Sequence, residues 1–240
     1  MLKISNLTIR YPQVTALDDV SLEFKNGTLY GLAGPNGAGK TSLIKAAVGQ
    51  VVEYEGEIQY DGLFLQHDRQ AIKRLFGYAP ENSELFPYLS GREYLQMIAD
   101  IRQCIDDGQV QRLLDDFGMT DVGNELINGY SHGMRQKISL AAALIGDPQN
   151  LILDEALNGF DPVSLYKAKN ILQARAQKGK TVILSSHVLE LVEQWCDVII
   201  ILHHGKIRAV YTAEQIESIK KETGKAFAEH FISLIQPSLP

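Results

Sequence analysis

The stretch that decides the fold is Gly34-Pro35-Asn36-Gly37-Ala38-Gly39-Lys40-Thr41. The apolar run at residues 28–33 before it is typical of a buried strand, and residues 42–48 after it favour a helix. In this setting the pattern G-x-x-x-x-G-K-[ST] predicts a phosphate-binding loop, because glycines let backbone N–H groups approach an anion closely. The positive end of the helix dipole adds to the attraction. The alternative is a glycine-rich turn that binds nothing, and the flanking strand and helix argue against it.

Two side chains of this loop are predicted to bind different parts of a nucleotide–metal complex. Lys40 is placed to reach the β- and γ-phosphates of a nucleotide, and the Thr41 hydroxyl is placed to ligate Mg²⁺. The sequence therefore predicts binding of a nucleotide together with Mg²⁺. The remaining nucleotide-binding candidates belong to the loop and its first helical turn: Gly34, Pro35, Asn36, Gly37, Ala38, Gly39 and Ser42.

The composition describes a mildly acidic globular chain. Its 240 residues include 23 Lys and Arg against 29 Asp and Glu, a net charge of −6, which argues against a broad nucleic-acid surface. Cys104 and Cys196 are far apart and lack metal-ligand spacing, which fits a reducing compartment. The N-terminus lacks the apolar core of a signal peptide, and no apolar run reaches bilayer length. We expect a soluble chain that leaves the spanning of any membrane to another chain.

The hydrophobic pattern predicts an α/β core interrupted by helices. Strands are expected at residues 2–9, 20–24, 28–33, 57–60, 76–79, 150–154, 181–185, 198–202 and 206–210, with 76–79 as a central strand. Strand signals fade between residues 81 and 146, where a capping box at Ser90–Glu93 begins the first of three predicted helices. We expect a core of residues 1–80 and 147–222, a helical insertion at 81–146, and a tail at 223–240 whose structure stays open.

A second group of residues narrows the chemistry. The apolar run Leu151–Leu153 ends in Asp154 and Glu155. A carboxylate at the end of such a strand lies beside the Mg²⁺ site, and a second one next to it can orient or deprotonate an attacking water. The alternative, an acidic turn after a buried strand, loses weight because a phosphate loop lies upstream.

Ser131-His132-Gly133 directly precedes a predicted helix. The N-terminus of a helix is a second anion site, which a chain with one nucleotide pocket does not itself need. It makes sense if it completes the pocket of a partner across a dimer. The alternative is a helix simply capped by Ser131.

With these motifs in order, the sequence resembles the ATP-binding cassette (ABC) ATPases, the motor subunits of ABC transporters. The resemblance extends from Tyr11 to at least Gly205. It implies a single ABC ATPase domain over residues 1–240, with a P-loop NTPase (RecA-like) core, an N-terminal antiparallel β subdomain and an inserted α-helical subdomain. The matching motifs are residues 34–41 (Walker A), 78–82 (Q-loop), 130–137 (signature), 151–155 (Walker B), 158–161 (D-loop) and 185–187 (switch histidine).

The resemblance also implies residue roles. Lys40, Thr41 and Asp154 would hold the phosphates of ATP and Mg²⁺, with Glu81 on the metal side. Glu155 would be the catalytic base and His187 would contact the γ-phosphate. The remaining nucleotide contacts would be Tyr11, stacked on adenine, and Ser131 and Gly133, gripping ATP held by the opposite subunit, with Asp161 coupling the two sites at the dimer interface.

Two departures from the family pattern affect these expectations. His132 and Met134 replace the first Gly and the Gln of the usual Leu-Ser-Gly-Gly-Gln signature, and Glu81 replaces the usual Gln of the Q-loop. The signature changes would reduce turnover, or be neutral if His132 points outward. Glu81 can still face the metal but adds a negative charge.

The resemblance implies an ATP-hydrolysing motor of an ABC transporter, closest in look to exporters whose membrane subunits are separate chains. Its expected partners are transmembrane permease subunits and a second ABC ATPase subunit, with no nucleic acid. The expected location is cytoplasmic, peripheral at the inner face of the cell membrane through the permease subunits. The alternatives are a soluble ABC ATPase acting on the ribosome or nucleic acid, a regulatory low-activity cassette, and a small-molecule kinase, which would leave the signature and His187 unexplained.

Overall fold

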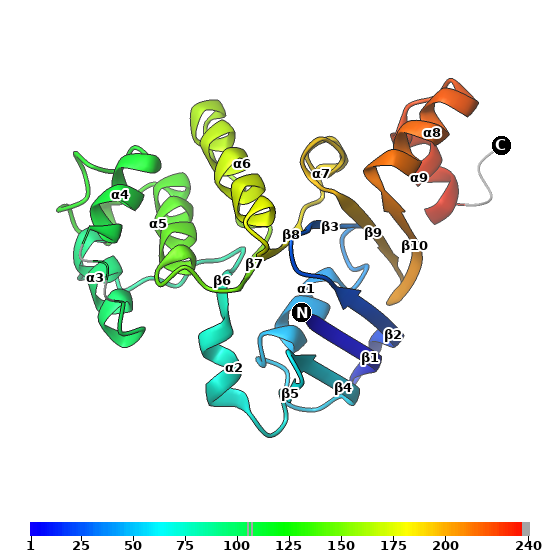
Figure 1. Cartoon of the computed structure of the whole chain (residues 1–240), viewed down its shortest axis with the longest axis horizontal. Helices are drawn as coiled ribbons and strands as arrows, with labels where there is room; N and C mark the ends of the chain where they lie inside the picture. The colour runs from blue at the N-terminus through cyan, green and yellow to red at the C-terminus, as the bar shows by residue number, and fades with distance from the viewer. Residues whose placement is uncertain (105, 107, 237–240) are drawn as a thin grey trace.

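The computed structural model describes residues 1–104, 106 and 108–236 of the chain. Its elements form two sheets with helices around and between them (Figure 1). The first sheet is antiparallel with strand order β2-β1-β4-β5. Its strands are β1 (Leu2–Tyr11), β2 (Val14–Phe24), β4 (Glu55–Tyr60) and β5 (Leu63–Phe64).

Strand β2 begins at Val14 rather than at the predicted residue 20. Its pairing with β1 contains several register shifts, and Asp19 has a positive φ of 53°. Such irregularities break the alternation of apolar and polar residues on which the prediction relied.

The second sheet has the strand order β10-β9-β3-β8-β7-β6. The pairings from β9 to β6 are parallel, and β10 joins β9 antiparallel. Its strands are β3 (Leu29–Ala33), β6 (Phe76–Ala79), β7 (Asn150–Asp154), β8 (Thr181–Ser185), β9 (Val198–His203) and β10 (Lys206–Thr212). The predicted α/β architecture with a separate antiparallel sheet is confirmed.

The prediction of a central strand at residues 76–79 is wrong, because β6 lies at the edge of the sheet. It is nevertheless largely buried, since α5 (His132–Leu144) packs closely against it. A Cβ on Gly77 would lie 1.8 Å from the Ala143 carbonyl oxygen. The apolar pattern therefore indicates that the faces of the strand are buried, but it does not indicate whether other strands pair with both of its edges.

Helix α1 (Lys40–Ala47) lies between the two sheets. Alternate residues of the parallel strands face opposite layers: Ile152 packs toward α1 and the antiparallel sheet, whereas Leu151 and Leu153 pack toward the helices on the other face. Those helices include α5, α6 (Pro162–Gln177) and α7 (Leu189–Trp195). Both faces of the sheet are thus covered, which explains its continuous apolar strands.

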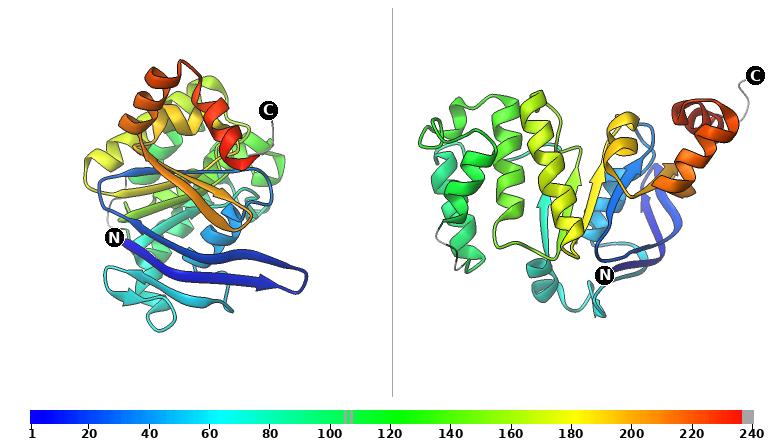
Figure 2. Two further views of the ribbon diagram at one scale, coloured as in Figure 1. Left: turned by 90° about the vertical axis from the view of Figure 1, so that its right-hand side faces the viewer. Right: turned by 45° about the horizontal axis from the view of Figure 1, so that its top comes forward.

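The chain between β6 and β7 contains helices α3 (Gly91–Ile101), α4 (Gln109–Asp116), η1 (Ile127–Gly129) and α5. They stand to one side of the sheets, at the left of Figure 1 and of the right-hand view in Figure 2. The Ser90–Glu93 capping box begins α3 as predicted, and a short helix, α2 (Arg69–Leu75), leads into β6.

The C-terminal region forms α8 (Ala213–Thr223) and α9 (Phe227–Ile235). Phe227 is buried, with its ring centroid 5.9 Å from that of Tyr211. The Tyr211 hydroxyl lies 2.9 Å from His230 Nε2. Residues 237–240 of the predicted tail lie outside the described residues.

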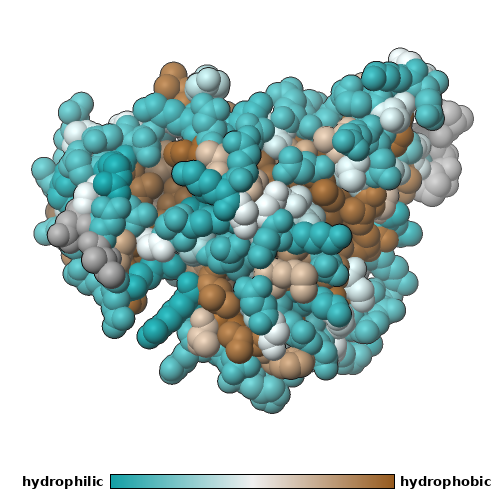
Figure 3. Space-filling model, in the orientation of Figure 1, coloured by the Kyte–Doolittle hydropathy of each residue, from teal (hydrophilic) through white to brown (hydrophobic). Residues whose placement is uncertain are grey.

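The visible surface is mostly hydrophilic, with separate apolar patches rather than one continuous apolar face (Figure 3). Within the described ranges, the helices are all too short or too polar to cross a bilayer. Both cysteines are free thiols; Cys196 is buried, and burial raises its pKa.

Candidate functional site

The predicted phosphate loop joins the end of β3 to the start of α1. Its conformation requires glycine at Gly39, which caps α1 with a φ of 108° and whose Cβ, if present, would lie 2.6 Å from the Ala16 carbonyl oxygen. The Lys40 side chain folds back along the loop, and its Nζ donates to the carbonyl oxygens of Gly34 (2.8 Å) and Pro35 (3.4 Å). Lys40 is only 6% exposed, so its charge lies inside a closed cradle.

Glu155 connects this cradle to the end of a neighbouring strand. One of its carboxylate oxygens, Oε1, lies 3.8 Å from Lys40 Nζ, and the other, Oε2, lies 2.8 Å from His187 Nδ1. Glu155 has a positive φ of 51°, a backbone conformation that is unfavourable for a residue with a Cβ. The structure therefore brings three predicted site residues into one chain of contacts, although they are far apart in sequence.

Asp154 is the last residue of β7 and is 1% exposed. Its Oδ1 accepts hydrogen bonds from the Ser185 hydroxyl (2.7 Å) and the Thr41 hydroxyl (3.3 Å). Burial raises the pKa of the Asp154 carboxyl, and the Glu155 charge adds to this, while the two hydroxyl bonds and Lys40 oppose it. Burial of the carboxyl is thus the main cause of the raised pKa.

This donor set fits Mg²⁺. Mg²⁺ prefers oxygen ligands and is usually held by one or two carboxylates together with phosphate oxygens and waters. The Thr41 hydroxyl and the Asp154 carboxylate are oxygen donors already within hydrogen-bonding distance of each other. The described residues contain no cluster of three or more His, Cys, Asp or Glu side chains that would hold a metal without a substrate.

A hollow of about 560 Å³ opens above the loop. Its walls bring together most of the predicted nucleotide-binding residues, including Tyr11, which is 43% exposed at the end of β1. Val14 and Ala16, which follow Tyr11, were not predicted and extend the same wall. The predicted residues in the lining are Tyr11, Asn36, Gly37, Ala38, Gly39, Lys40, Thr41, Ser42, Glu81, Glu155 and His187.

Glu81 lies at the rim of this hollow and is held from behind by Gln136. The Gln136 Nε2 donates to the Glu81 carbonyl oxygen, and its Oε1 accepts from the Ser83 hydroxyl (3.0 Å). Gln136 is 1% exposed and belongs to α5. The loop after β6 and helix α5 are therefore joined by a buried amide that sequence reasoning missed; its only signal was a polar residue on the apolar face of a helix.

The predicted signature residues lie apart from the hollow, and neither Ser131 nor Gly133 belongs to its described lining. Ser131 caps α5, with its hydroxyl accepting from the Met134 N–H (3.2 Å), and its side chain is exposed. A Cβ on Gly133 would lie 2.4 Å from the Gly159 carbonyl oxygen, so the start of α5 packs tightly on the loop after β7. His132 is exposed beside them.

Asp161 is also outside the described lining of the hollow. Its side chain caps α6 by accepting from the Ser164 N–H (2.9 Å) and pairs with Lys137 Nζ on α5 (2.7 Å). The Lys137 hydrogen bond, followed by those from Ser164, holds the pKa of this carboxyl well below its usual range. Asp161 thus joins the starts of two helices within one chain.

The parallel sheet, the phosphate loop after β3 and the acidic end of β7 define a P-loop nucleotide hydrolase. Comparison with known proteins makes this class specific. The family model described as "ABC transporter" matches residues 17–158. The chain therefore belongs to the ABC transporter family, as one of its ATP-binding cassettes, and is an ATP hydrolase.

Relatives match over most of the chain. An uncharacterized ABC transporter ATP-binding protein of Bacillus subtilis, YhcH, is 34% identical over 99% of this chain and 76% of its own length. The bacitracin transport ATP-binding protein BcrA of Enterococcus faecalis is 31% identical over 86% of this chain and 68% of its own length. A solved structure described as the ATP-binding subunit of an ABC transporter superposes with a TM-score of 0.88 at 28% identity, covering 98% of this chain and 99% of that one.

Proposed function

We propose that this chain is the motor subunit of an exporter: two copies, or this chain and a related one, bind ATP and Mg²⁺ head to tail and drive separate transmembrane subunits. Residues 81–146 act as the inserted helical subdomain of a single cassette, residues 1–80 and 147–222 as its core, and 223–240 as a tail. Relatives named for bacitracin transport and for lantibiotic transport support a role in moving such compounds, and export is the direction that we propose. The proposed location is cytoplasmic, at the inner face of the membrane through the permease subunits, and the acidic balance supports partners other than nucleic acid.

One observation carries the proposal: the start of α5, which resembles the signature, lies outside the described lining of the nucleotide hollow. Its described lining holds the phosphate loop, Glu155 and His187, whereas Ser131 is exposed at the start of α5, outside that lining. The exposed N-terminus of a helix is suited to a phosphate. A second chain turned head to tail would supply this group to the hollow of the first, and Asp161 would lie at the contact between them.

The proposal assigns the residues of the hollow separate roles in ATP binding and hydrolysis. Lys40 and the loop N–H groups bind the phosphates, Thr41 and Asp154 hold Mg²⁺ with Glu81 on the metal side, and Tyr11 stacks on adenine. Mg²⁺ would neutralise charge on the γ-phosphoryl group. Glu155 accepts the proton of the attacking water, and His187, 2.8 Å from Oε2, keeps the carboxylate aimed. ATP moves a partner only through its tighter binding to the closed dimer.

The dimer is tested in the Glu155→Gln background, where hydrolysis is blocked. With ATP and Mg²⁺ this variant should elute as a dimer in size-exclusion chromatography. Adding Ser131→Arg should leave a monomer that still binds ATP, because arginine blocks the contact at the start of α5. Thr212→Arg is the matched control, since Thr212 caps α8 in the same way and is exposed. A persistent dimer with Ser131→Arg would contradict the head-to-tail arrangement.

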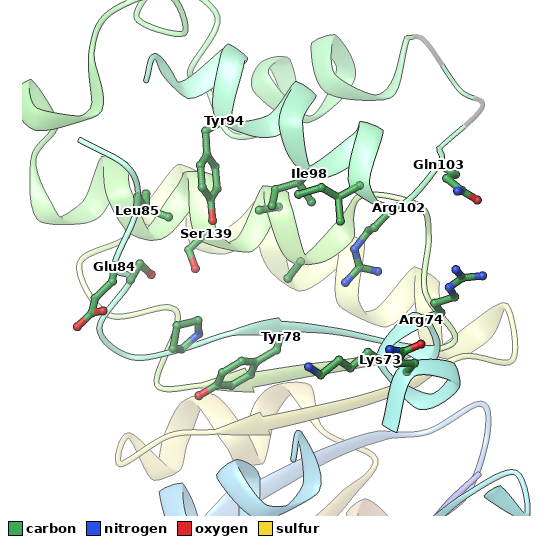
Figure 4. Close-up of a pocket in the computed structure, with 17 residues that line it drawn as sticks. Lys73, Arg74, Tyr78, Glu84, Leu85, Tyr94, Ile98, Arg102, Gln103 and Ser139 are labelled. Atoms are coloured by element: carbon green, nitrogen blue, oxygen red, sulfur yellow. The ribbon is translucent and has the colours of Figure 1, made fainter. Parts of the chain in front are cut away.

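The proposed docking place for the permease subunits is the groove between the core and the inserted helices (Figure 4). This groove has a volume of about 600 Å³, and Ser83, Glu84 and Leu85 of the loop after β6 line it. In Figure 4 Tyr94 and Ile98 of α3 point into it from one side, and Tyr78 lies opposite. Phe86 and Tyr88 on the same loop are exposed, at 58% and 84%. These apolar surfaces support binding of another protein.

The groove is also basic at the end formed by α2. Lys73, Arg74 and Arg102 line the groove, and among its described lining residues only Glu84 is acidic. This charge supports a permease segment that carries acidic residues beside its apolar ones. Tagged Glu155→Gln protein should capture a polytopic membrane protein from solubilised membranes, and Arg74→Glu should lose it while keeping ATP binding. Lys25→Glu, a charge reversal on an exposed turn elsewhere, is the control. Ribosomal proteins in place of a membrane protein would favour the soluble alternative.

A further inference from the structure

We propose that Ser185 is a positioning residue that sets both the metal affinity of Asp154 and the aim of Glu155. Ser185 ends β8 and is the register partner of Asp154 on the neighbouring strand β7. It is fully buried, so its hydroxyl has only protein groups to bond in the apo chain. The inference rests on the proposed role of Asp154 as a metal ligand.

The direction of both Ser185 hydrogen bonds is fixed by chemistry. An ionised carboxylate only accepts and a backbone N–H only donates. The hydroxyl proton therefore goes to Asp154 Oδ1 (2.7 Å), and a hydroxyl lone pair receives the Glu155 N–H (3.0 Å). One buried hydroxyl thus holds the side chain of one acidic residue and the backbone of the next.

The first bond selects which carboxylate oxygen remains for a cation. Thr41 also donates to Asp154 Oδ1. In the described part of the chain, both hydrogen bonds to this carboxylate end on Oδ1, and Oδ2 receives none. Ser185 consequently fixes the rotation of the carboxylate and presents Oδ2 as a metal ligand. Partners of this kind that orient a metal ligand are generally needed for full metal affinity.

The second bond acts on Glu155. A buried N–H needs a partner, and the strand ladder ends at Asp154. The Ser185 hydroxyl is that partner, and it holds the N–H of a residue whose φ of 51° is otherwise unfavourable. This conformation sends the Glu155 carboxylate toward Lys40 and His187. Loss of the hydroxyl should therefore misaim the base as well as weaken the metal site.

The test compares nucleotide binding with and without metal. The fluorescent nucleotide MANT-ADP is titrated into the full chain in EDTA and in Mg²⁺, and the ratio of the two dissociation constants measures how strongly the metal is coupled to binding. We expect Ser185→Ala to keep the dissociation constant in EDTA within about twofold and to reduce the Mg²⁺ effect by about 10-fold, the lower end for a residue behind a metal ligand. Its kcat should fall more than its KM rises. Ser185→Thr, which keeps the hydroxyl, should restore both.

Two further variants distinguish a failure of the Ser185 proposal from a failure of the Asp154 assignment. Thr181→Val removes a buried hydroxyl at the other end of β8, where it bonds Asn26 Oδ1, and should leave the Mg²⁺ effect unchanged. Asp154→Asn should abolish the Mg²⁺ effect. If it does and Ser185→Ala does not, the proposal for Ser185 is wrong while the site assignment stands. If Asp154→Asn keeps the Mg²⁺ effect, the assignment of Asp154 fails first. Equal loss of binding in EDTA and Mg²⁺ by Ser185→Ala would reduce Ser185 to a structural residue.

Discussion

The two regions that we propose bind phosphate differ in how completely the chain itself organises them. At the phosphate loop, Lys40 and Glu155 are buried and bonded to groups of their own chain. At the start of α5, Ser131 is exposed, and its only described hydrogen bonds are those of its own helix. The first region is organised before anything binds, whereas the second presents the capped start of a helix to solvent. In the proposed dimer, one part of the nucleotide site would be organised within the chain and the other would be supplied by its partner.

The largest effect is expected on ATP hydrolysis, at the Glu155 carboxylate beside the phosphate loop. Glu155→Gln should lower ATP hydrolysis by at least about 100-fold, because a general base typically contributes that much. The amide keeps the shape of the side chain, so ATP binding should persist. Phosphate release and equilibrium dialysis measure the two quantities. Glu190→Gln, an exposed acid in the first turn of α7, is the matched control. Wild-type hydrolysis by Glu155→Gln would remove the assignment of the base.

The next largest effect concerns binding. Lys40→Met should weaken ATP binding by about 100-fold, because it removes a charge-assisted hydrogen bond from a closed cradle. Lys45→Met changes an exposed lysine in the last turn of the same helix and should leave the affinity unchanged. Isothermal titration with ATP compares them. Equal affinities for both variants would show that the Lys40 ammonium bonds only its own loop.

A smaller effect is expected at the start of α5, where Ser131 caps the helix. Ser131→Ala and Thr212→Ala each remove a helix cap and should each cost about 1 kcal/mol in unfolding free energy. Only Ser131→Ala should also lower ATP hydrolysis, by about 10-fold, through a lost hydrogen bond to phosphate. Urea unfolding and phosphate release on the same samples make the comparison. Unchanged hydrolysis in Ser131→Ala would leave Ser131 as a cap alone.

The smallest effect is expected at Asp161, which caps α6 and pairs with Lys137 of α5. Its pKa is lowered in the folded chain, so its ionised form stabilises the fold above the ordinary carboxyl pKa of about 4, and this stability is lost as pH falls further. Asp161→Asn should lose about 0.5 kcal/mol at pH 7, since the pair with Lys137 is half-exposed. The difference from wild type should shrink below about pH 4. Urea unfolding across this range measures it, and a difference that grows at low pH would contradict the assignment.

Local sequence was a good guide where local chemistry decides the structure. The strand–loop–helix around Lys40 and the cap at Ser90 lie where their patterns predict. Each depends mainly on residues within a few positions of one another.

Sequence was a poor guide where distant contacts decide. Residues 76–79 have the apolar pattern of a central strand because α5 covers them, although they lie at the sheet edge, and α9 forms where Phe227 packs against Tyr211. The roles of Ser185 and Gln136 were missed for the same reason, since each bonds a residue at least 30 positions away. A serine closing an apolar run beside an acidic strand end was the only available sign.

The position of β6 at the sheet edge has a mechanical consequence. The chain leaves the sheet at Ala79 and returns at Asn150, whose register partner is Phe76 on the adjacent strand. Ala79 itself pairs with Leu153, so the two connections lie at opposite ends of adjacent strands. The inserted helices are thus attached along one edge of the sheet, through these two connections and the packing of α5 on β6. Gln136 ties α5 to the chain just after Ala79. A displacement of the loop at Glu81 would therefore be passed to α5 and to α3 and α4, which pack on it.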